Sequence, residues 1–462
     1  MAAIEIIAGN EPPQNAMGTR PVNRLLLSMA IPMMFAMLVQ SLYNIVDRIF
    51  VARLGETALA AVSLTFPLQM LLLHISVGTG VGVNALLSKS LGERNFALVR
   101  RSALNGLFLG VLTSLVFVSV AFWGVDFYFQ NQKVSGAILA YGRDYLRLVC
   151  LFSFTLVGQV LLERLLMSTG KVVCQMISQI AGALINLALD PIMIFGLFGC
   201  PRLEVAGAAV ATVIGEAAAM LLALYFNLRK NKEIDFSLKG FRPDWAVLGR
   251  IYSVGIPSIL LGALGSVMVY GLNRILLGTA ASASAVAVLG VYFGLQSFIF
   301  MPVFGLNNAL IPIVAFNFGA RQKRRIWRAI ELSCLYAVGL MTLGLLIFQI
   351  FPAELLRLFN ATPQMLAVGV PALRIISAHY IFAALCIEAI SVFQALGHGL
   401  ESLCAAAFRQ LALLLPAAWL LSLLPDANAI WWSFPLAEIG SLIMVAALIQ
   451  RVYARQIRPL PD

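Results

Sequence analysis

Hydrophobic residues fill long stretches of this chain, and polar residues are concentrated in the short gaps between them. Each stretch is long enough for a helix to cross the hydrocarbon core of a bilayer, which is roughly 30 Å thick. None shows the alternation of polar and apolar residues that is typical of a membrane β-barrel strand. We predict an all-α integral membrane protein with twelve transmembrane helices, near residues 25–51, 58–86, 102–124, 143–167, 174–198, 205–228, 247–277, 285–315, 327–350, 368–394, 402–424 and 428–450.

The second half of the chain repeats the first half. Ile31-Pro32 returns as Ile256-Pro257, Asp47 is replaced by Asn273, and Gly92 returns as Gly319. Internal repeats are common in transporters, and the substrate site then lies at the interface between the two halves. We therefore predict two pseudo-symmetric six-helix bundles that form a V-shaped cavity.

Polar segments set the predicted boundaries of these bundles. The start of the chain has no basic region followed by a short apolar stretch, so we do not interpret it as a signal peptide. The predicted organisation is a cytoplasmic tail over residues 1–22, an N-lobe over 23–228, a cytoplasmic linker over 229–245, a C-lobe over 246–452 and a cytoplasmic tail over 453–462.

Composition and charge agree with a membrane location. Hydrophobic residues make up 61% of the chain and charged residues only 11%. The net charge of +11 could suggest a nucleic-acid partner, but most Lys and Arg residues fall in loops predicted for one side. The positive-inside rule places that side and both termini in the cytoplasm. We therefore expect a multi-pass protein of the plasma membrane. Anionic lipid headgroups explain the charge, so we expect no nucleic acid and no obligate protein partner.

Asp47 lies in the outer part of the first predicted helix. Tyr43 and Asn44 precede it by about one turn, so the three side chains share a helix face. An ionised Asp at the centre of a membrane helix costs about 2.5–3.5 kcal/mol on insertion scales, which makes such a residue a functional candidate. The alternative is a simple ion pair with Arg48 or Arg53 near the membrane surface.

A second polar group lies in the fifth predicted helix. Asn186 and Asp190 are four residues apart and share a face, and Pro191 cannot donate a hydrogen bond to the carbonyl of Leu187. Carboxylate, amide and carbonyl oxygens suit a hard cation such as Na⁺, or a shared proton. Thr212, in the sixth predicted helix, adds a hydroxyl at a similar depth. We expect a coupling site for H⁺ or Na⁺ here.

Only the first half keeps the acidic pair, because the repeat has Asn273 at the position of Asp47 and Ala417 near the position of Asp190. We therefore expect ion coupling in the N-lobe, with bending of the two coupling helices at Pro32 and Pro191. The expected coupling residues are Asp47, Asn186, Asp190 and Thr212, supported by Tyr43 and Asn44.

These motifs resemble the multidrug and toxic compound extrusion (MATE) family, nearest its prokaryotic branch of DinF-like and MepA-like transporters. The resemblance covers roughly residues 20–455 and is carried by the segments 42–47, 186–191 and 207–212. It implies two six-helix bundles around a central cavity, and export of amphipathic, often cationic compounds in exchange for inward H⁺ or Na⁺. The coupling positions of the family map to Asp47, Asn186, Asp190 and Thr212.

A substrate cavity between the bundles needs polar groups that attract a cation and flexible side chains that adapt to different shapes. Buried carboxylates supply the first property, and methionines supply the second. The residues that we expect to line such a cavity are Glu388, Glu216, Gln69, Met33, Met70 and Met301.

Three other functions fit a polytopic membrane protein. A flippase for a lipid-linked precursor would share the two-lobe architecture but needs basic residues inside its cavity. An intramembrane aspartyl protease would use two aspartates, but Asp47 and Asp190 lack the Tyr-Asp and Gly-x-Gly-Asp patterns of that group. A channel is also compatible with the composition. The chain has no P-loop, Gly-x-Ser-x-Gly or His-Glu-x-x-His motif, so we expect a secondary transporter without a cofactor rather than an enzyme.

Overall fold

The computed structural model describes residues 15–132, 135–278, 282–359, 361–426 and 428–461. These residues are almost entirely helical, and no strand occurs among them. Ten of the described helices are long and apolar enough to cross a membrane, and two bent helix pairs raise the number to as many as twelve. The prediction of an all-α membrane protein with twelve spans is confirmed.

The N-lobe begins after a short helix α1 (Ala16–Thr19) and is built from eight helices. A π-helical turn over 120–124 joins α4 to α5, and a 3-10 turn over 197–199 follows α8. The helices are α2 (Val22–Ala52), α3 (Glu56–Gly92), α4 (Phe96–Ser119), α5 (Val125–Asn131), α6 (Gly136–Leu151), α7 (Ser153–Ser168), α8 (Val172–Phe195) and α9 (Glu204–Lys230).

The C-lobe follows the linker and repeats this arrangement. Its irregular helical turns cover 408–414, 429–432 and 453–457. The helices are α10 (Trp245–Leu276), α11 (Ser282–Gly319), α12 (Lys323–Ile350), α13 (Pro352–Arg357), α14 (Pro363–Ser377), α15 (Tyr380–Ala395), α16 (Gly399–Ala407), α17 (Leu415–Ser422) and α18 (Ser433–Val452).

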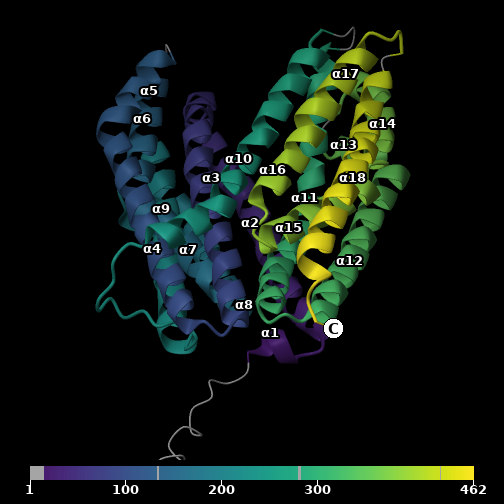
Figure 1. Cartoon of the computed structure of the whole chain (residues 1–462). Coiled ribbons are helices and arrows are strands. Elements are labelled where there is room, and N and C mark those ends of the chain that lie inside the picture. Colours follow the sequence, from purple (N-terminus) through teal and green to yellow (C-terminus); the bar gives the residue numbers. More distant parts are fainter. Residues whose placement is uncertain (1–14, 133–134, 279–281, 360, 427, 462) are drawn as a thin grey trace, which may run out of the picture.

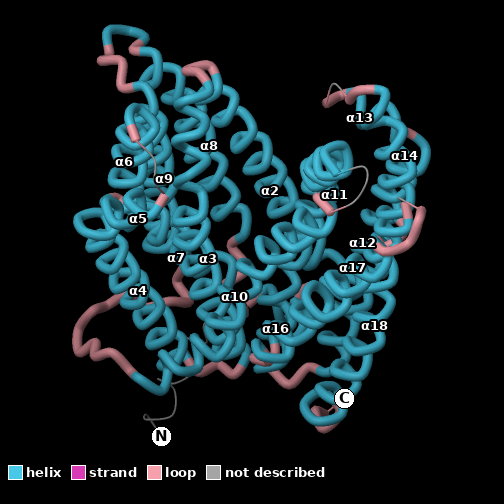
Figure 2. The backbone as a smooth tube through the Cα atoms, turned by 90° about the horizontal axis from the view of Figure 1, so that it is seen from above, coloured by secondary structure: helices cyan, strands magenta, loops and turns pink. Residues whose placement is uncertain are grey.

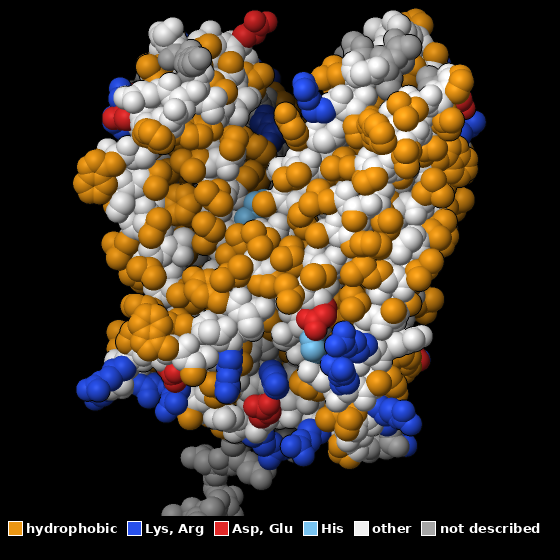
Figure 3. Space-filling model, turned by 45° about the horizontal axis from the view of Figure 1, so that its top comes forward, with side chains coloured by type: hydrophobic (Ala, Val, Ile, Leu, Met, Phe, Trp, Pro, Cys, Tyr) orange, Lys and Arg blue, Asp and Glu red, His pale blue; other side chains and the backbone are white. Residues whose placement is uncertain are grey.

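The two lobes stand side by side and diverge at one end (Figure 1). The C-terminus and the start of α1 lie at the opposite end, which we call the terminal end. The lobes meet mainly through three helix pairs, which are α10 against α3, α11 against α2 and α11 against α3. Seen along the long axis of the molecule, the two bundles flank these shared helices (Figure 2). Apolar side chains cover the flanks, and Lys and Arg gather near the terminal end (Figure 3).

Two glycines at equivalent positions of the repeat close the terminal end. A β-carbon on Gly92, at the end of α3, would lie only 1.9 Å from the carbonyl oxygen of Phe316 in α11. A β-carbon on Gly319, at the end of α11, would lie 2.1 Å from the carbonyl oxygen of Lys89 in α3. Small residues allow such close approach of membrane helices. The repeat therefore forms a pseudo-two-fold contact at which the backbones of α3 and α11 touch.

Gly92→Val should weaken this contact measurably. Overpacking a close contact costs about 1–3 kcal/mol, because the neighbouring backbone must move away. We expect a lower midpoint in a thermal unfolding experiment on the purified protein. Gly339→Val is the matched control, because a β-carbon at Gly339 would meet nothing within 4 Å. Equal midpoints for the two variants would contradict the close contact.

Two spans that we predicted as single helices are bent pairs. The predicted helix 143–167 is divided into α6 and α7, which meet at 46°, and the predicted helix 368–394 is divided into α14 and α15, which meet at 50°. Side chains bind the carbonyls that a break exposes: the Nδ1 atom of His379 lies 2.5 Å from the carbonyl oxygen of Ile376. The two breaks occupy equivalent places in the repeat, so the bend belongs to both lobes.

Candidate functional site

Helices α8 and α9 pack closely because glycines face each other across the contact. A β-carbon on Gly182 or on Gly215 would lie 2.7 Å from the carbonyl oxygen of the other glycine. This close approach places Asn186 of α8 against Thr212 of α9, and the Asn186 Nδ2 atom donates a hydrogen bond to the Thr212 Oγ1 atom over 3.2 Å. The two residues that we predicted on separate helices therefore touch.

Asp190 and Asp47 meet between α8 and α2. Asp190 is fully buried, and its carboxyl group lies within interaction range of the carboxyl group of Asp47. Neither carboxyl oxygen of Asp190 has a hydrogen-bond partner among the described residues, and the same holds for the buried Oδ1 atom of Asp47. A buried carboxylate without a partner is costly, so this pair needs a proton or a cation.

The arginines beside Asp47 have other contacts. The Arg48 guanidinium lies 5.3 Å from the ring centroid of Phe66, and the Arg53 guanidinium lies 5.9 Å from the ring centroid of Phe50. Within the described residues, Asp47 forms no ion pair with either arginine. Arg48 nevertheless lies within electrostatic range of the Asp47 carboxyl group, so the structure shows a longer-range attraction there rather than a close ion pair.

The two supporting residues border a cavity next to the carboxyl pair. Tyr43 lies within electrostatic reach of Asp47, Asp190 and Glu216. Tyr43 and Asn44 line a cavity of about 300 Å³ together with Asn186, Thr212 and Glu216. Of the expected coupling residues, Asp47 and Asp190 form the carboxyl pair, and the others lie in the wall of the adjacent cavity. Pro32 and Pro191 lie within α2 and α8, which continue unbroken through both prolines.

This cavity contains some of the residues that we predicted for substrate binding. Met33, Glu216 and Met301 line it, and Met301 reaches it from the C-lobe helix α11. The Glu216 carboxylate accepts a hydrogen bond of 2.8 Å from the Thr155 hydroxyl. The cavity therefore lies mainly in the N-lobe and is closed on one side by the C-lobe.

Gln69, Met70 and Glu388 do not line this cavity, so their part in substrate binding stays a prediction. Gln69 donates a hydrogen bond of 2.6 Å to Thr65 on its own helix. Glu388 is fully buried inside the C-lobe, where it accepts a hydrogen bond of 2.7 Å from Ser333. These helices are apolar on most faces, so the sequence carries little information on which face points to the cavity.

A chain of side-chain amides along the cavity was missed by the sequence analysis. The Gln179 Nε2 atom donates to the Gln40 Oε1 atom over 2.6 Å, and the Gln175 Nε2 atom donates to the Gln179 Oε1 atom over 2.7 Å. Gln159 donates to Glu163 over 3.1 Å. All five residues line the cavity. Residues 175 and 179, like residues 159 and 163, are four apart and therefore share a helix face. This spacing is the feature of the sequence that could have predicted the hydrogen bonds.

Arg164, near the end of α7, also lines the cavity. Its side chain is 8% exposed, and its Nη1 atom donates a hydrogen bond of 2.8 Å to the Oδ1 atom of Asn308 in the C-lobe. Gly80 makes room for it, because a β-carbon there would lie 2.7 Å from the Arg164 Cγ atom. Arg164 therefore links the lobes inside the protein.

The donor set of the carboxyl pair suits a small hard cation. Asp47, Asp190, Asn186 and Thr212 offer two carboxylates, an amide and a hydroxyl, which are the oxygen ligands that such ions prefer. No group of three or more His, Cys, Asp or Glu residues in the described part of the chain could hold a metal ion. The unpartnered oxygens of this site accordingly fit a proton or a monovalent ion better than a transition metal.

The amino-acid sequence matches the MatE family over residues 32–192 and 257–420, which cover equivalent parts of both lobes. This chain belongs to the MATE family. It is therefore a transporter rather than an enzyme, as the motifs predicted. This MATE transporter is 28% identical over 440 residues to the FAD transporter of Shewanella oneidensis, an alignment that covers 94% of the chain and 95% of the relative. It is 26% identical over 416 residues to multidrug export protein MepA of Staphylococcus haemolyticus, with 90% of each chain covered.

Solved structures share the fold of this MATE transporter. A multidrug resistance MATE family transporter in an outward-facing conformation superposes with a TM-score of 0.90 at 23% identity, over 96% of this chain and 99% of that chain. A MOP superfamily transporter from Pyrococcus furiosus superposes with a TM-score of 0.89 at the same identity and coverage. The two-lobe architecture of this chain is thus the architecture of these transporters.

Proposed function

We propose that this MATE transporter is a multidrug efflux antiporter of the plasma membrane, which exports small amphipathic organic compounds in exchange for inward H⁺ or Na⁺. The observation that carries the proposal is the carboxyl pair of buried Asp190 and half-buried Asp47, in which three buried oxygens have no hydrogen-bond partner among the described residues. This pair lies on α2 and α8, the same helices that line the cavity. Binding of a proton or cation is thereby linked to the wall of the substrate site.

The amide chain provides the mechanical link between the two sites. Gln40 lies two turns before Asp47 on α2 and accepts a hydrogen bond from Gln179 of α8. Neutralising Asp47 and Asp190 removes the need for their carboxylates to be solvated, so α2 can move toward α8. Bending of α2 at Pro32 would narrow the cavity and expel its contents, because proline removes one hydrogen bond within a helix.

The orientation of the protein in the membrane follows from the charge distribution. Lys and Arg gather at the terminal end, and the positive-inside rule places such an end in the cytoplasm, against anionic headgroups. Both termini are then cytoplasmic, and the lobes diverge toward the outside. The likeness to an outward-facing MATE structure supports this assignment.

The lining of the cavity favours neutral or cationic substrates. Glu216 contributes a carboxylate, whereas Arg164 stands beside Glu163 and offsets its charge. Methionines, including Met33 and Met301, give an adaptable apolar wall. Such a surface accepts flat amphipathic compounds of different shapes.

Flavin export is a second candidate function. The relative from Shewanella oneidensis bears the name FAD transporter. Arg164 is the one basic residue among the described residues that line the cavity, and it could meet a phosphate or another anionic group. The amides of Gln175 and Gln179 could bind the polar edge of a heterocycle.

Efflux from proteoliposomes tests the function and its coupling ion. A pH gradient and a sodium gradient are imposed separately, and the release of a cationic dye and of FAD is followed in parallel. We expect dye efflux that depends on one of the two gradients. Efflux of FAD without efflux of the dye would favour the second candidate. Efflux that follows the solute gradient alone would indicate a channel.

Thr212→Val should weaken the binding of the coupling ion without abolishing transport. Valine has the shape of threonine but no hydroxyl, so Asn186 loses its partner and the ion loses one oxygen. A hydrogen bond of this kind contributes about 1 kcal/mol, so we expect the half-saturating concentration of the coupling ion to rise roughly fivefold. The measurement is initial efflux rate against ion concentration. Thr113→Val, in α4 outside the cavity, should leave that value unchanged.

A further inference from the structure

Helix α1 is a single turn that lies between the lobes at the terminal end. It has four residues, and an isolated helix of this length is unstable in water. The Asn15 Oδ1 atom caps it by accepting a hydrogen bond of 2.9 Å from the Met17 backbone nitrogen. Met17 is fully buried. Tertiary contacts therefore hold this turn in place.

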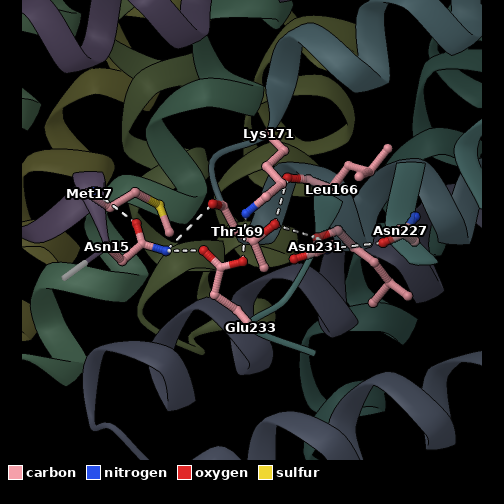
Figure 4. A network of polar contacts seen from close by, with 9 residues as sticks. Asn15, Met17, Leu166, Thr169, Lys171, Asn227, Asn231 and Glu233 are labelled. Carbon is pink, nitrogen blue, oxygen red and sulfur yellow. Dashed lines mark hydrogen bonds and ion pairs between the residues drawn. The ribbon is translucent and has the colours of Figure 1, made fainter. Parts of the chain in front are cut away.

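On one side, α1 is attached to the N-lobe and its linker. The Asn15 Nδ2 atom lies 3.5 Å from the carbonyl oxygen of Thr169 and 3.4 Å from the Glu233 Oε1 atom. Glu233 also forms an ion pair of 2.5 Å with Lys171. Figure 4 shows these side chains converging around Glu233, with Met17 beside them. The start of α1 is thus fixed to the end of α7 and the start of α8.

On the other side, α1 is attached to the C-lobe through Arg325 of α12. The Arg325 Nη2 atom donates hydrogen bonds to the carbonyl oxygens of Met17, over 2.9 Å, and Arg20, over 2.8 Å. Its Nε atom donates to the Asn317 Oδ1 atom over 2.9 Å, which orients the guanidinium. The Asn317 Nδ2 atom lies 3.3 Å from the Met17 carbonyl oxygen. Bonds from a guanidinium are charge-assisted and directional.

The N-lobe has an arginine with similar contacts. Arg100 of α4 donates from its Nη2 atom to the carbonyl oxygens of Ser237, over 2.7 Å, and Lys239, over 2.8 Å. These residues belong to the segment that leads into α10, the first helix of the C-lobe. In each lobe, one arginine near the start of the third span therefore holds the segment that precedes the first span of the other lobe.

Cavities lie on both sides of α1. A cavity of about 270 Å³ borders Ala16 and Met17, and a cavity of about 710 Å³ borders Gly18 and Thr19. Between these cavities, the hydrogen bonds from α1 to the C-lobe come from Arg325 and Asn317. Removing the bonds from Arg325 would take away the most directional contact that joins the two lobes through α1 when the terminal end is closed.

We propose that α1 and Arg325 form an interlobe latch that keeps the terminal end closed, with Arg100 as its counterpart in the N-lobe. The latch holds when the lobes diverge at the far end. It must release for the terminal end to open during a transport cycle. Arg325 acts by positioning the lobes, and it does not touch the substrate cavity.

Arg325→Ala should shift the protein toward separation of the lobes at the terminal end. Spin labels at Lys232→Cys and Arg328→Cys, both exposed, report this separation in a background without the six native cysteines that still transports. We expect the population at longer distance to rise about threefold or more, because charge-assisted hydrogen bonds are lost from one conformation only. The measurement needs neither substrate nor coupling ion, so it can fail independently of the proposed function.

Two control variants make this result specific. Arg324→Ala removes the same charge from the exposed neighbour of Arg325 and should leave the distances unchanged. Arg325→Lys keeps the charge but loses the planar fork, and it should give an intermediate shift. Identical distance distributions for Arg324→Ala and Arg325→Ala would overturn the latch.

A cross-link tests whether release is required. A β-carbon on Gly18 would lie 2.9 Å from the tip of the Phe316 ring, so a short bifunctional thiol reagent with a cleavable bridge can join cysteines at these two positions. Cross-linking should stop efflux, and cleavage of the bridge should restore it. Unchanged transport by the cross-linked protein would show that the latch does not need to open, and would overturn the proposal.

Discussion

Asp47→Asn should reduce gradient-driven efflux to the level of empty liposomes while leaving the folded protein intact. Asparagine has the shape of aspartate but cannot take up a proton or balance the charge of a cation. Asp190 would then lose the carboxyl group beside it. The conformation of the N-lobe would then no longer depend on whether the coupling ion is bound, so the ion gradient could not drive export.

The same assay needs a variant at the equivalent position of the other lobe. Asn273→Ala, at the repeat counterpart of Asp47, should transport like the unsubstituted protein, because the C-lobe carries no carboxyl pair at this place. Thermal unfolding of both variants checks that the fold is retained. Robust gradient-driven efflux by Asp47→Asn would refute the assignment of coupling to this pair.

Arg409→Leu should destabilise the C-lobe strongly. The Arg409 Nη1 atom lies 2.9 Å from the Glu438 Oε1 atom, and the side chains are only 18% and 8% exposed. Removing one partner of a buried ion pair leaves an uncompensated charge, which costs about 3–5 kcal/mol. Chemical unfolding of the purified protein should show a loss of this size.

The double variant Arg409→Leu with Glu438→Leu separates charge from packing. Replacing both partners by apolar residues removes the buried charge and should recover most of the lost stability. A double variant as unstable as the single one would show that the side-chain shapes, and not the charges, stabilise this contact. A single variant that unfolds like the unsubstituted protein would contradict the importance of the pair.

These two predictions reflect an electrostatic difference between lobes of similar fold. In the C-lobe, Glu438 has Arg409, and Glu388 accepts a hydrogen bond from Ser333. In the N-lobe, Asp47 and Asp190 face each other with unpartnered oxygens. The C-lobe therefore pairs Glu438 with an internal cation, whereas the carboxyl pair of the N-lobe has no such partner among the described residues.

Most of the fold could be predicted because spans are local features. A membrane helix is defined by a run of apolar residues, and the repeat is visible as equivalent motifs such as Gly92 and Gly319. The breaks within the spans near 152 and 378–379 were not visible, because both sides of each break are equally apolar. Their bends depend on contacts with neighbouring helices.

The candidate site was only partly readable from the sequence. Asp47 and Asp190 could be placed at one depth because helix direction and length fix the height of a residue in the bilayer. The side to which Gln69, Met70 and Glu388 point could not be predicted, and the structure places none of them at the cavity beside Asn186. Position along a helix says how deep a residue lies, but the side to which it points depends on packing when the helix is apolar all round.

The amino-acid sequence alone determined the membrane class, the two-fold repeat and the acidic residues that only one half retains, because each is a property of local composition. Only the tertiary structure decided that Arg164 reaches Asn308 across the lobes and that Arg325 holds α1. Those partners are far apart in the chain, separated by 144 residues in the first case and by 308 in the contact between Arg325 and Met17. Contacts of this kind leave no periodic signal, since they arise from how whole helices pack.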